Sequence, residues 1–286
     1  MKKDKIISII VGTIVLIAIY IALYPTISNF YWQSKQTSTI YSYNETLKET
    51  TQEKIQQLKD RADKYNKQLY EKYKTSIFTY QGSSATDEDY ESQLNMIASS
   101  MGYIEIPKIN VYLPIAHGTK TEDLDSMAGH LYQSSLPVGG TNTHAIISAH
   151  TGLAQTKLFT DLDQLSVGDE FYVYTLNKKL CYKVIEVNVC TPEEDYHYMQ
   201  IEPGKDLVSL YTCTPYGIND HRLIVKGEHD TSKDKILEIP KDDIEVKNQN
   251  RTNVVMFYVL IGVPLLLYGT YIFIILRKGK KHEGQE

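Results

Sequence analysis

The sequence is poor in cysteine, and its few cysteines lack the spacings that hold structural metals. Among 286 residues there are 3 cysteines. No Cys-x-x-Cys or His-x-x-x-His pair occurs, which argues against a zinc site. Cys181 and Cys190 lie in one strand-like run that, when extended, would separate them by ~30 Å, far beyond disulfide range. An odd number also leaves at least one thiol free. We therefore expect no disulfide framework, no metal and no cofactor.

Other common signatures are absent as well. The sequence has no Gly-x-Ser-x-Gly nucleophile elbow and no phosphate-binding glycine loop, so a nucleotide site is not expected. The formal net charge is -5 at pH 7. Because basic residues cluster at both ends, the middle of the chain is more acidic than this figure. Such a surface suits neither nucleic acid nor anionic lipid, and we expect no nucleic-acid partner.

Charged residues are missing from two long apolar runs, 6–24 and 254–276. A helix needs about 20 apolar residues to cross a bilayer, so each run is long enough. A cleavable signal peptide is the alternative for the first run. Against it, the run exceeds the roughly 7–15 apolar residues of such a peptide, and no small-x-small cleavage site follows. Basic residues flank the outer end of each run, so the positive-inside rule predicts that both termini are cytoplasmic.

Residues 44–75 contain neither glycine nor proline and carry an apolar stripe at helical spacing. The stripe consists of Ile55, Leu58, Ala62, Tyr65 and Leu69. It predicts a helix with Asn44 as its N-cap. Docking on a neighbouring domain is favoured over a coiled-coil dimer, because the stripe lasts only about two heptads. Residues 76–98 show no strong periodicity and are predicted to form a loop or flexible lid.

From residue 101 onward the sequence changes to short runs rich in β-forming residues, separated by Gly, Pro, Asn and Asp. The predicted strands are 103–106, 111–115, 145–149, 170–175, 181–189, 207–212 and 222–227. Among the connections only 157–165 looks helical, and only for a turn or two. Many short strands without regular intervening helices indicate a mainly β domain, either an antiparallel sandwich or a closed barrel.

Three chemically active side chains lie at the ends of these predicted strands. His150 follows one strand, Cys213 follows another, and Arg222 opens the next. Each has an ordinary alternative: a structural histidine, a small buried cysteine, a solvated surface arginine. A rigid sheet can instead hold a base, a nucleophile and a cation with their reactive groups accessible to a substrate. The pattern therefore favours a cysteine acyl-transferase site. Three other histidines compete for the role of base: His130, His144 and His221. The last is discounted because it adjoins the arginine cation.

The sequence around these residues resembles the sortase family over about residues 99–228. The likeness is carried by residues 147–153 (ISAHTGL), 157–162 (KLFTDL), 210–217 (LYTCTPYG) and 221–223 (HRL). Residues 102–107 (GYIEIP), 134–140 (SSLPVGG) and the second apolar run are similar, more narrowly, to class C, pilus-assembling sortases.

Two departures from the family pattern stand out. The usual Thr-Leu-x-Thr-Cys begins with Ser209 here, a mild change. Class C enzymes commonly carry an Asp-Pro-aromatic lid over the active site, but this chain has no Asp-Pro dipeptide and no proline between Pro25 and Pro107. Self-inhibition by that motif is therefore not predicted, although residues 76–98 can cover the cleft through another contact.

The resemblance implies an eight-stranded sortase barrel and a transpeptidase that acts on Leu-Pro-x-Thr-Gly-like sorting signals of pilin or surface proteins. Cys213 would be the nucleophile, His150 the general acid and base, and Arg222 the residue that holds the oxyanion and positions the signal. The acceptor would be a lysine amine of the next pilin subunit. A cell-wall-anchoring sortase, a cysteine hydrolase, or a non-enzymatic membrane-tethered binding protein remain alternatives.

The implied organisation has seven parts, with the catalytic domain outside the cell. They are a cytoplasmic tail (1–5), a transmembrane helix (6–24), an extracellular helical segment with a lid loop (25–98), the catalytic barrel (99–230), a linker (231–253), a transmembrane helix (254–276) and a basic cytoplasmic tail (277–286).

Overall fold

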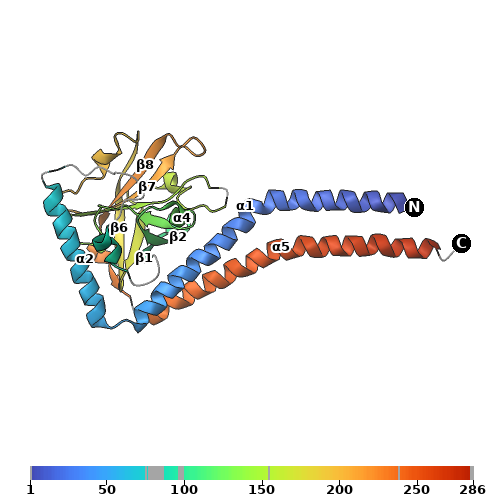
Figure 1. Cartoon of the computed structure of the whole chain (residues 1–286), viewed down its shortest axis with the longest axis horizontal. Helices are drawn as coiled ribbons and strands as arrows, with labels where there is room; N and C mark the ends of the chain where they lie inside the picture. The colour runs from blue at the N-terminus through green and yellow to red at the C-terminus, as the bar shows by residue number, and fades with distance from the viewer. Residues whose placement is uncertain are drawn as a thin grey trace.

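The computed structural model describes residues 2–74, 76, 87–95, 100–153, 155–237 and 239–283. A β-barrel lies at one end of the molecule, and two long helices extend from it side by side to the chain termini (Figure 1). The predicted lid segment, 76–98, is described only at 76 and 87–95, so the rest of that prediction lies outside the described residues.

Eight strands close into the barrel, as the resemblance to sortases implied. They are β1 (Ser100–Ile106), β2 (Val111–His117), β3 (Ala128–His130), β4 (Thr143–Ser148), β5 (Glu170–Thr175), β6 (Lys178–Cys190), β7 (Asp206–Thr214) and β8 (His221–His229). The order is β5-β1-β2-β3-β4-β7-β8-β6, and pairing of β5 with β6 closes the ring. A two-residue strand, β9 (Lys235–Ile236), adds to β6. The pairs β2–β3 and β4–β7 are parallel, so the alternative of a purely antiparallel sandwich was wrong.

One barrel strand, β3, was missing from the sequence-based prediction. Its three residues are Ala-Gly-His, and all are buried, so it carries no alternation of polar and apolar residues. A Cβ at Gly129 would lie 2.4 Å from the carbonyl oxygen of Gly118, so only glycine permits this approach of the chains. The turn predicted at 157–165 contains a 3-10 helix at Leu162–Gln164.

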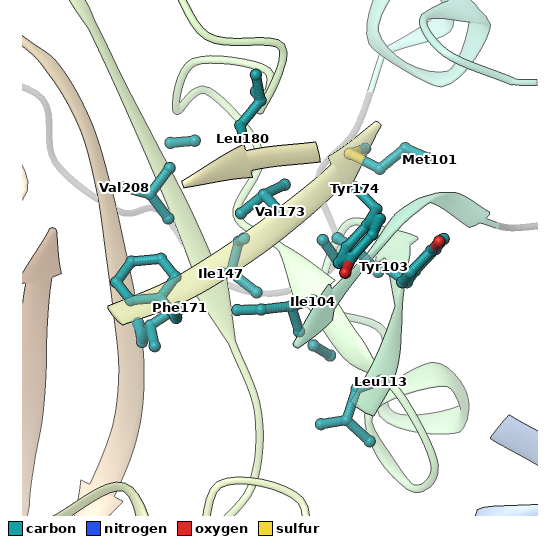
Figure 2. Close-up of a cluster of buried hydrophobic side chains, with 14 of the residues drawn as sticks. Met101, Tyr103, Ile104, Leu113, Ile147, Phe171, Val173, Tyr174, Leu180 and Val208 are labelled. Atoms are coloured by element: carbon teal, nitrogen blue, oxygen red, sulfur yellow. The ribbon is translucent and has the colours of Figure 1, made fainter. Parts of the chain in front are cut away.

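The barrel interior is filled by apolar and aromatic side chains from most of its strands (Figure 2). Tyr103 and Tyr174 stack with ring centroids 4.3 Å apart, and Phe171 stacks on Tyr182 at 5.6 Å. Each fully buried side chain of this size contributes ~1.5–3 kcal/mol through removal of apolar surface from water. This packing makes the barrel a rigid support for residues at its strand ends.

The helices of the structure are α1 (Lys2–Glu49), α2 (Gln52–Tyr73), α3 (Glu88–Ser92), α4 (Thr121–Leu124) and α5 (Ile239–Glu283). The prediction of one helix over 44–75 with Asn44 as N-cap was wrong. Asn44 is buried within α1, and Thr51 caps α2 by accepting a hydrogen bond from the Lys54 N–H. The apolar stripe gave no sign of the break between α1 and α2, because the stripe begins only at Ile55.

Helix α2 docks on the barrel through its apolar stripe, as predicted. All five stripe residues are buried. Beside them, the Asn66 side chain donates to the Leu136 carbonyl at 3.0 Å and accepts from the Leu136 N–H at 2.7 Å. This pair of bonds satisfies the backbone of the loop before β4 and fixes the helix relative to the barrel.

Helices α1 and α5 are long and apolar enough to cross a membrane, and their apolar segments are exposed. They pack against each other along their length. The hydroxyls of Thr13 and Tyr268 lie 2.6 Å apart, and Tyr20 donates to the Ile261 carbonyl at 2.5 Å. Both chain termini lie at the same end of this helix pair, away from the barrel (Figure 1). This arrangement fits association with a membrane.

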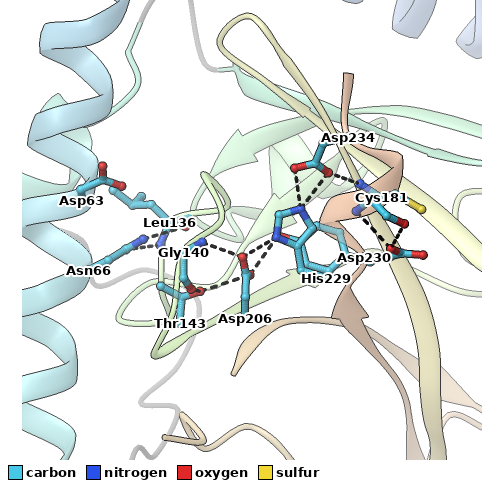
Figure 3. A network of polar contacts seen from close by, with 12 residues as sticks. Asp63, Asn66, Leu136, Gly140, Thr143, Cys181, Asp206, His229, Asp230 and Asp234 are labelled. Atoms are coloured by element: carbon cyan, nitrogen blue, oxygen red, sulfur yellow. Dashed lines mark hydrogen bonds and ion pairs between the residues drawn. The ribbon is translucent and has the colours of Figure 1, made fainter. Parts of the chain in front are cut away.

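A histidine held between two carboxylates ties the segment after the barrel back to it (Figure 3). His229 Nδ1 lies 2.7 Å from Asp206 Oδ2, and its Nε2 lies 2.8 Å from Asp234 Oδ1. Burial lowers the pKa of His229, but the hydrogen bonds and charges of the two carboxylates outweigh burial, so the pKa is raised above its ordinary value. The segment predicted as a linker, 231–253, thus holds an ordered contact, strand β9 and the start of α5.

We expect His229→Gln to destabilise the protein by about 1.5–3 kcal/mol at about pH 6, the range for hydrogen bonds to charged groups. Because the folded-state pKa is raised above the unfolded value of about 6.5, the stabilisation is complete below that value. It is lost as the pH rises through the raised pKa. Thermal unfolding of the detergent-solubilised wild type and His229→Gln, at about pH 6 and about pH 9, measures how the loss of stability changes with pH. The exposed His197→Gln is the control, and an equal deficit at both pH values would contradict the charge assignment.

Candidate active site

Cys213 lies next to the end of β7, where the chain turns at Pro215. Its thiol is half-buried, whereas Cys181 and Cys190 are buried. In the antiparallel ladder between β7 and β8, Cys213 is paired directly with Arg222. Residues paired in this way place their side chains on the same face, so the predicted nucleophile and the predicted cation are neighbours.

His150 joins this pair from the other side of β7. Strands β4 and β7 are parallel, with Ser148 paired with Tyr211. Two hydrogen bonds extend this pairing. The Ala149 N–H donates to the Tyr211 carbonyl at 3.1 Å, and the Thr212 hydroxyl donates to the Ala149 carbonyl at 2.7 Å. Continuing the register by two residues sets His150 beside Cys213. In this continued register the three predicted residues form one row, with Cys213 on β7 and Arg222 on β8 paired directly and His150 two residues beyond the end of β4.

The loops that follow His150 and Cys213 contact each other. Gly152 has a φ of +75°, and a Cβ there would lie 3.4 Å from the Tyr216 ring. Behind it, the Phe159 N–H donates to the His150 carbonyl at 3.1 Å. These contacts fix the backbone on which the imidazole is carried. Tyr216 and Ile218 nevertheless expose 66% and 67% of their surface, which leaves large side chains exposed in the turn that follows Cys213.

Arg222 is held by groups that the sequence did not single out. Its Nε donates to the Tyr211 hydroxyl at 2.9 Å, and that hydroxyl donates to Asp195 Oδ2 at 2.7 Å. Nη1 donates to the carbonyls of Asn219 and His221 at 3.3 and 3.1 Å. Tyr211 could have been found from strand periodicity, because it precedes Cys213 by two residues and shares its face. Asp195 comes from the loop between β6 and β7 and carried no sequence signal.

Two of the competing histidines are structural. Burial lowers the pKa of both His130 and His144 to about 4. His144 donates through Nδ1 to the Gln200 carbonyl at 2.7 Å, and its Nε2 lies 2.8 Å from the Ser209 hydroxyl. Both rings are therefore neutral and enclosed. His221 points to the Asp220 carboxylate, at 2.8 Å, and is more exposed.

The described part of the predicted lid segment packs on the barrel through α3. Its Tyr90 is fully buried, and the hydroxyl lies 2.9 Å from His130 Nδ1 and accepts the Gly118 N–H at 2.9 Å. At the start of the helix, Asp87 accepts hydrogen bonds from the Tyr90 N–H and the Tyr132 hydroxyl. This segment is thus anchored without an Asp-Pro-aromatic motif.

Taken together, the row places a thiol, an imidazole and a guanidinium at one end of the barrel. A thiolate can attack a carbonyl, an imidazole can move a proton, and a guanidinium can bind the resulting oxyanion. Among the described residues there is no group of three or more His, Cys, Asp or Glu side chains placed to hold a metal ion. The set is suited to acyl transfer.

Comparisons with known proteins identify the family of this chain. Residues 104–230 match the model of the sortase domain. The chain is 30% identical over 187 residues to sortase A of Streptococcus agalactiae, covering 60% of this chain and 74% of that protein. The crystal structure of sortase C1 from Streptococcus agalactiae is 42% identical, with a TM-score of 0.62, and the likeness covers 68% of this chain and 98% of that one. A Clostridium perfringens sortase C, solved with the C-terminal cell wall sorting motif, is also 42% identical with a TM-score of 0.58 and covers 68% and 98%.

Proposed function

The chain belongs to the sortase family, in its class C branch, and from this premise we propose that it is a membrane-anchored transpeptidase of pilus assembly. It would cleave Leu-Pro-x-Thr-Gly-like sorting signals through a thioester and join pilin subunits through lysine isopeptide bonds. Family membership makes the protein a sortase enzyme, which removes the alternative of a non-enzymatic binding protein.

In the proposed mechanism, the Cys213 thiolate attacks the threonine carbonyl of the signal. Arg222 donates hydrogen bonds to the oxyanion that forms, and protonated His150 gives its proton to the glycine amine as the carbon–nitrogen bond breaks. The acyl group stays on sulfur as a thioester. A lysine amine then attacks the thioester, His150 takes a proton from it, and the thiolate is released. The observation that carries this proposal is the direct pairing of Cys213 with Arg222, with His150 placed beside them by the continued register of β4 and β7.

The proposed substrate class is supported by the surroundings of Cys213 and by the relatives. Tyr216 and Ile218 offer exposed apolar surface to the leucine and proline of a sorting signal. The solved structures that resemble this chain include a pilus-related sortase C and a sortase C solved with a cell wall sorting motif. Polymerisation of pilins, rather than anchoring of one protein to the wall, rests on this likeness to class C enzymes.

The proposed topology places both termini in the cytoplasm and the barrel outside the cell. It is supported by the pairing of α1 with α5, by the shared position of the termini, and by lysines at the start of the sequence and basic residues near its end. In this orientation the site faces the compartment in which exported surface proteins display their sorting signals.

We expect the detergent-solubilised chain to form an acyl adduct with a Leu-Pro-x-Thr-Gly peptide, seen by intact mass as the peptide minus its glycine. Addition of a peptide with a free lysine side chain should convert the adduct to an isopeptide-linked product. Release of the acyl group to water at the same rate with and without the lysine peptide would instead identify a cysteine hydrolase. No adduct with any sorting-signal peptide would contradict the proposed function.

A further inference from the structure

We infer that Tyr211 and Asp195 are positioning residues for Arg222, so that the loop between β6 and β7 sets the orientation of the guanidinium. This inference rests on the proposed function, because it assigns Arg222 to binding of the sorting signal. It adds two residues that act through the arginine, because Tyr211 is hydrogen-bonded to both Asp195 and Arg222.

The contact between Tyr211 and Arg222 follows from the strand register. Arg222 is paired with Cys213, and Tyr211 lies two residues earlier on the same face of β7, which makes Tyr211 the diagonal neighbour of the arginine. A tyrosine is long enough to reach across this diagonal, and its hydroxyl accepts the Nε–H at 2.9 Å. A smaller side chain at this position would leave Nε without that partner.

The direction of each hydrogen bond is determined by the chemistry of the three groups. A guanidinium only donates, and an ionised carboxylate only accepts. Tyr211 must therefore give its proton to Asp195, at 2.7 Å, and turn a lone pair toward Arg222. Burial raises the pKa of Tyr211 far above its ordinary value, so the hydroxyl keeps its proton.

Asp195 connects this pair to the loop between β6 and β7. It opens a 3-10 turn, Asp195–Tyr198, and is 7% exposed. Burial raises the pKa of its carboxyl, and the hydrogen bond from Tyr211 and the charge of Arg222 oppose that rise. A shift of this loop therefore moves the acceptor that orients the tyrosine, and with it the arginine.

The consequence for the site is a guanidinium with one free edge. Nε is bound by Tyr211, and Nη1 by the carbonyls of Asn219 and His221. No hydrogen bond from Nη2 occurs within the described ranges of the chain. Because the guanidinium is planar, hydrogen bonds at two of its nitrogens also fix the direction of the third. Nη2 is then oriented to donate a hydrogen bond to a carbonyl or oxyanion.

The first test compares the rate of acyl-adduct formation among single variants of the full chain in detergent. Tyr211→Phe and Asp195→Ala should each slow acylation about tenfold, as expected for loss of a hydrogen bond to a charged group. Asp195→Asn keeps an acceptor oxygen and should restore most of the rate. The loss should appear in kcat more than in KM, because the arginine binds the oxyanion most strongly. Tyr196→Phe and Glu193→Gln, from the same loop, are matched controls.

The second test asks whether the effect passes through the arginine. In an Arg222→Ala background, Tyr211→Phe should cause no further slowing. In protein labelled with ¹⁵N-arginine, the Nε–H signal of Arg222 is identified as the one that disappears in Arg222→Ala. This Nε–H should exchange with water faster in Tyr211→Phe than in the wild type. Additive slowing in the double variant, or unchanged exchange, would overturn this inference and leave the role of Arg222 standing. An unchanged rate in Arg222→Ala would overturn the proposed role of Arg222 and this inference with it.

Discussion

Replacing Cys213 by alanine should abolish the acyl adduct and lower the transpeptidation rate by ~10⁴-fold or more, the scale for loss of a catalytic nucleophile. The reason is that Cys213 supplies the only thiol in the row, and the thioester cannot form without it. Cys213 is the half-buried thiol, and it is paired with Arg222 next to the end of β7.

Cys190→Ala is the matched control for this experiment. Cys190 is paired with Arg222 from the opposite strand, β6, but it is buried, and burial raises its thiol pKa. It should therefore stay protonated and unreactive, and its removal should leave the adduct intact. Intact mass after incubation with the peptide measures both variants. An adduct that persists in Cys213→Ala and disappears in Cys190→Ala would reverse the assignment.

Replacing His150 by alanine should lower the rate of transpeptidation by ~10²–10⁴-fold, the range for loss of a general acid and base. The glycine amine is a poor leaving group unless it is protonated as the bond breaks. His130 and His144 cannot substitute, because both are enclosed and burial lowers the pKa of each to about 4.

A substrate with a better leaving group separates this role from a structural one. If His150 supplies a proton, an ester in place of the threonine–glycine amide should reduce the deficit of His150→Ala in acylation. His221→Gln, which removes the exposed histidine next to Arg222, should leave the rates close to wild type. A deficit of equal size with amide and ester would contradict the role of His150 as the acid.

Much of the fold was predictable from local patterns. The apolar runs predicted the two long apolar helices, and short β-type runs predicted seven of the barrel strands near their observed positions. The errors were also local. Strand β3 is too short and too uniformly buried to show alternation. The helix start capped by Thr51 was missed because the apolar stripe begins only at Ile55, beyond the break.

The residue types at strand ends were readable from the sequence alone. An apolar strand followed by Cys213, another followed by His150, and a third opened by Arg222 are one-dimensional facts, and they were enough to favour a cysteine acyl-transferase site. The register that aligns these residues was not readable. Strands β4 and β7 are far apart along the chain and pair in parallel, and such a choice depends on the closure of the whole barrel.

The sequence by itself therefore determined which chemistry is available, because strand periodicity and apolar length are local properties of the chain. Only the tertiary structure decided which side chains meet. It enclosed His130 and His144, paired Cys213 with Arg222, and brought Asp195 from a loop to the Tyr211 hydroxyl. The physical reason is that burial and hydrogen-bond geometry arise when distant segments pack together, and neither quantity is encoded in the neighbours of a residue along the chain.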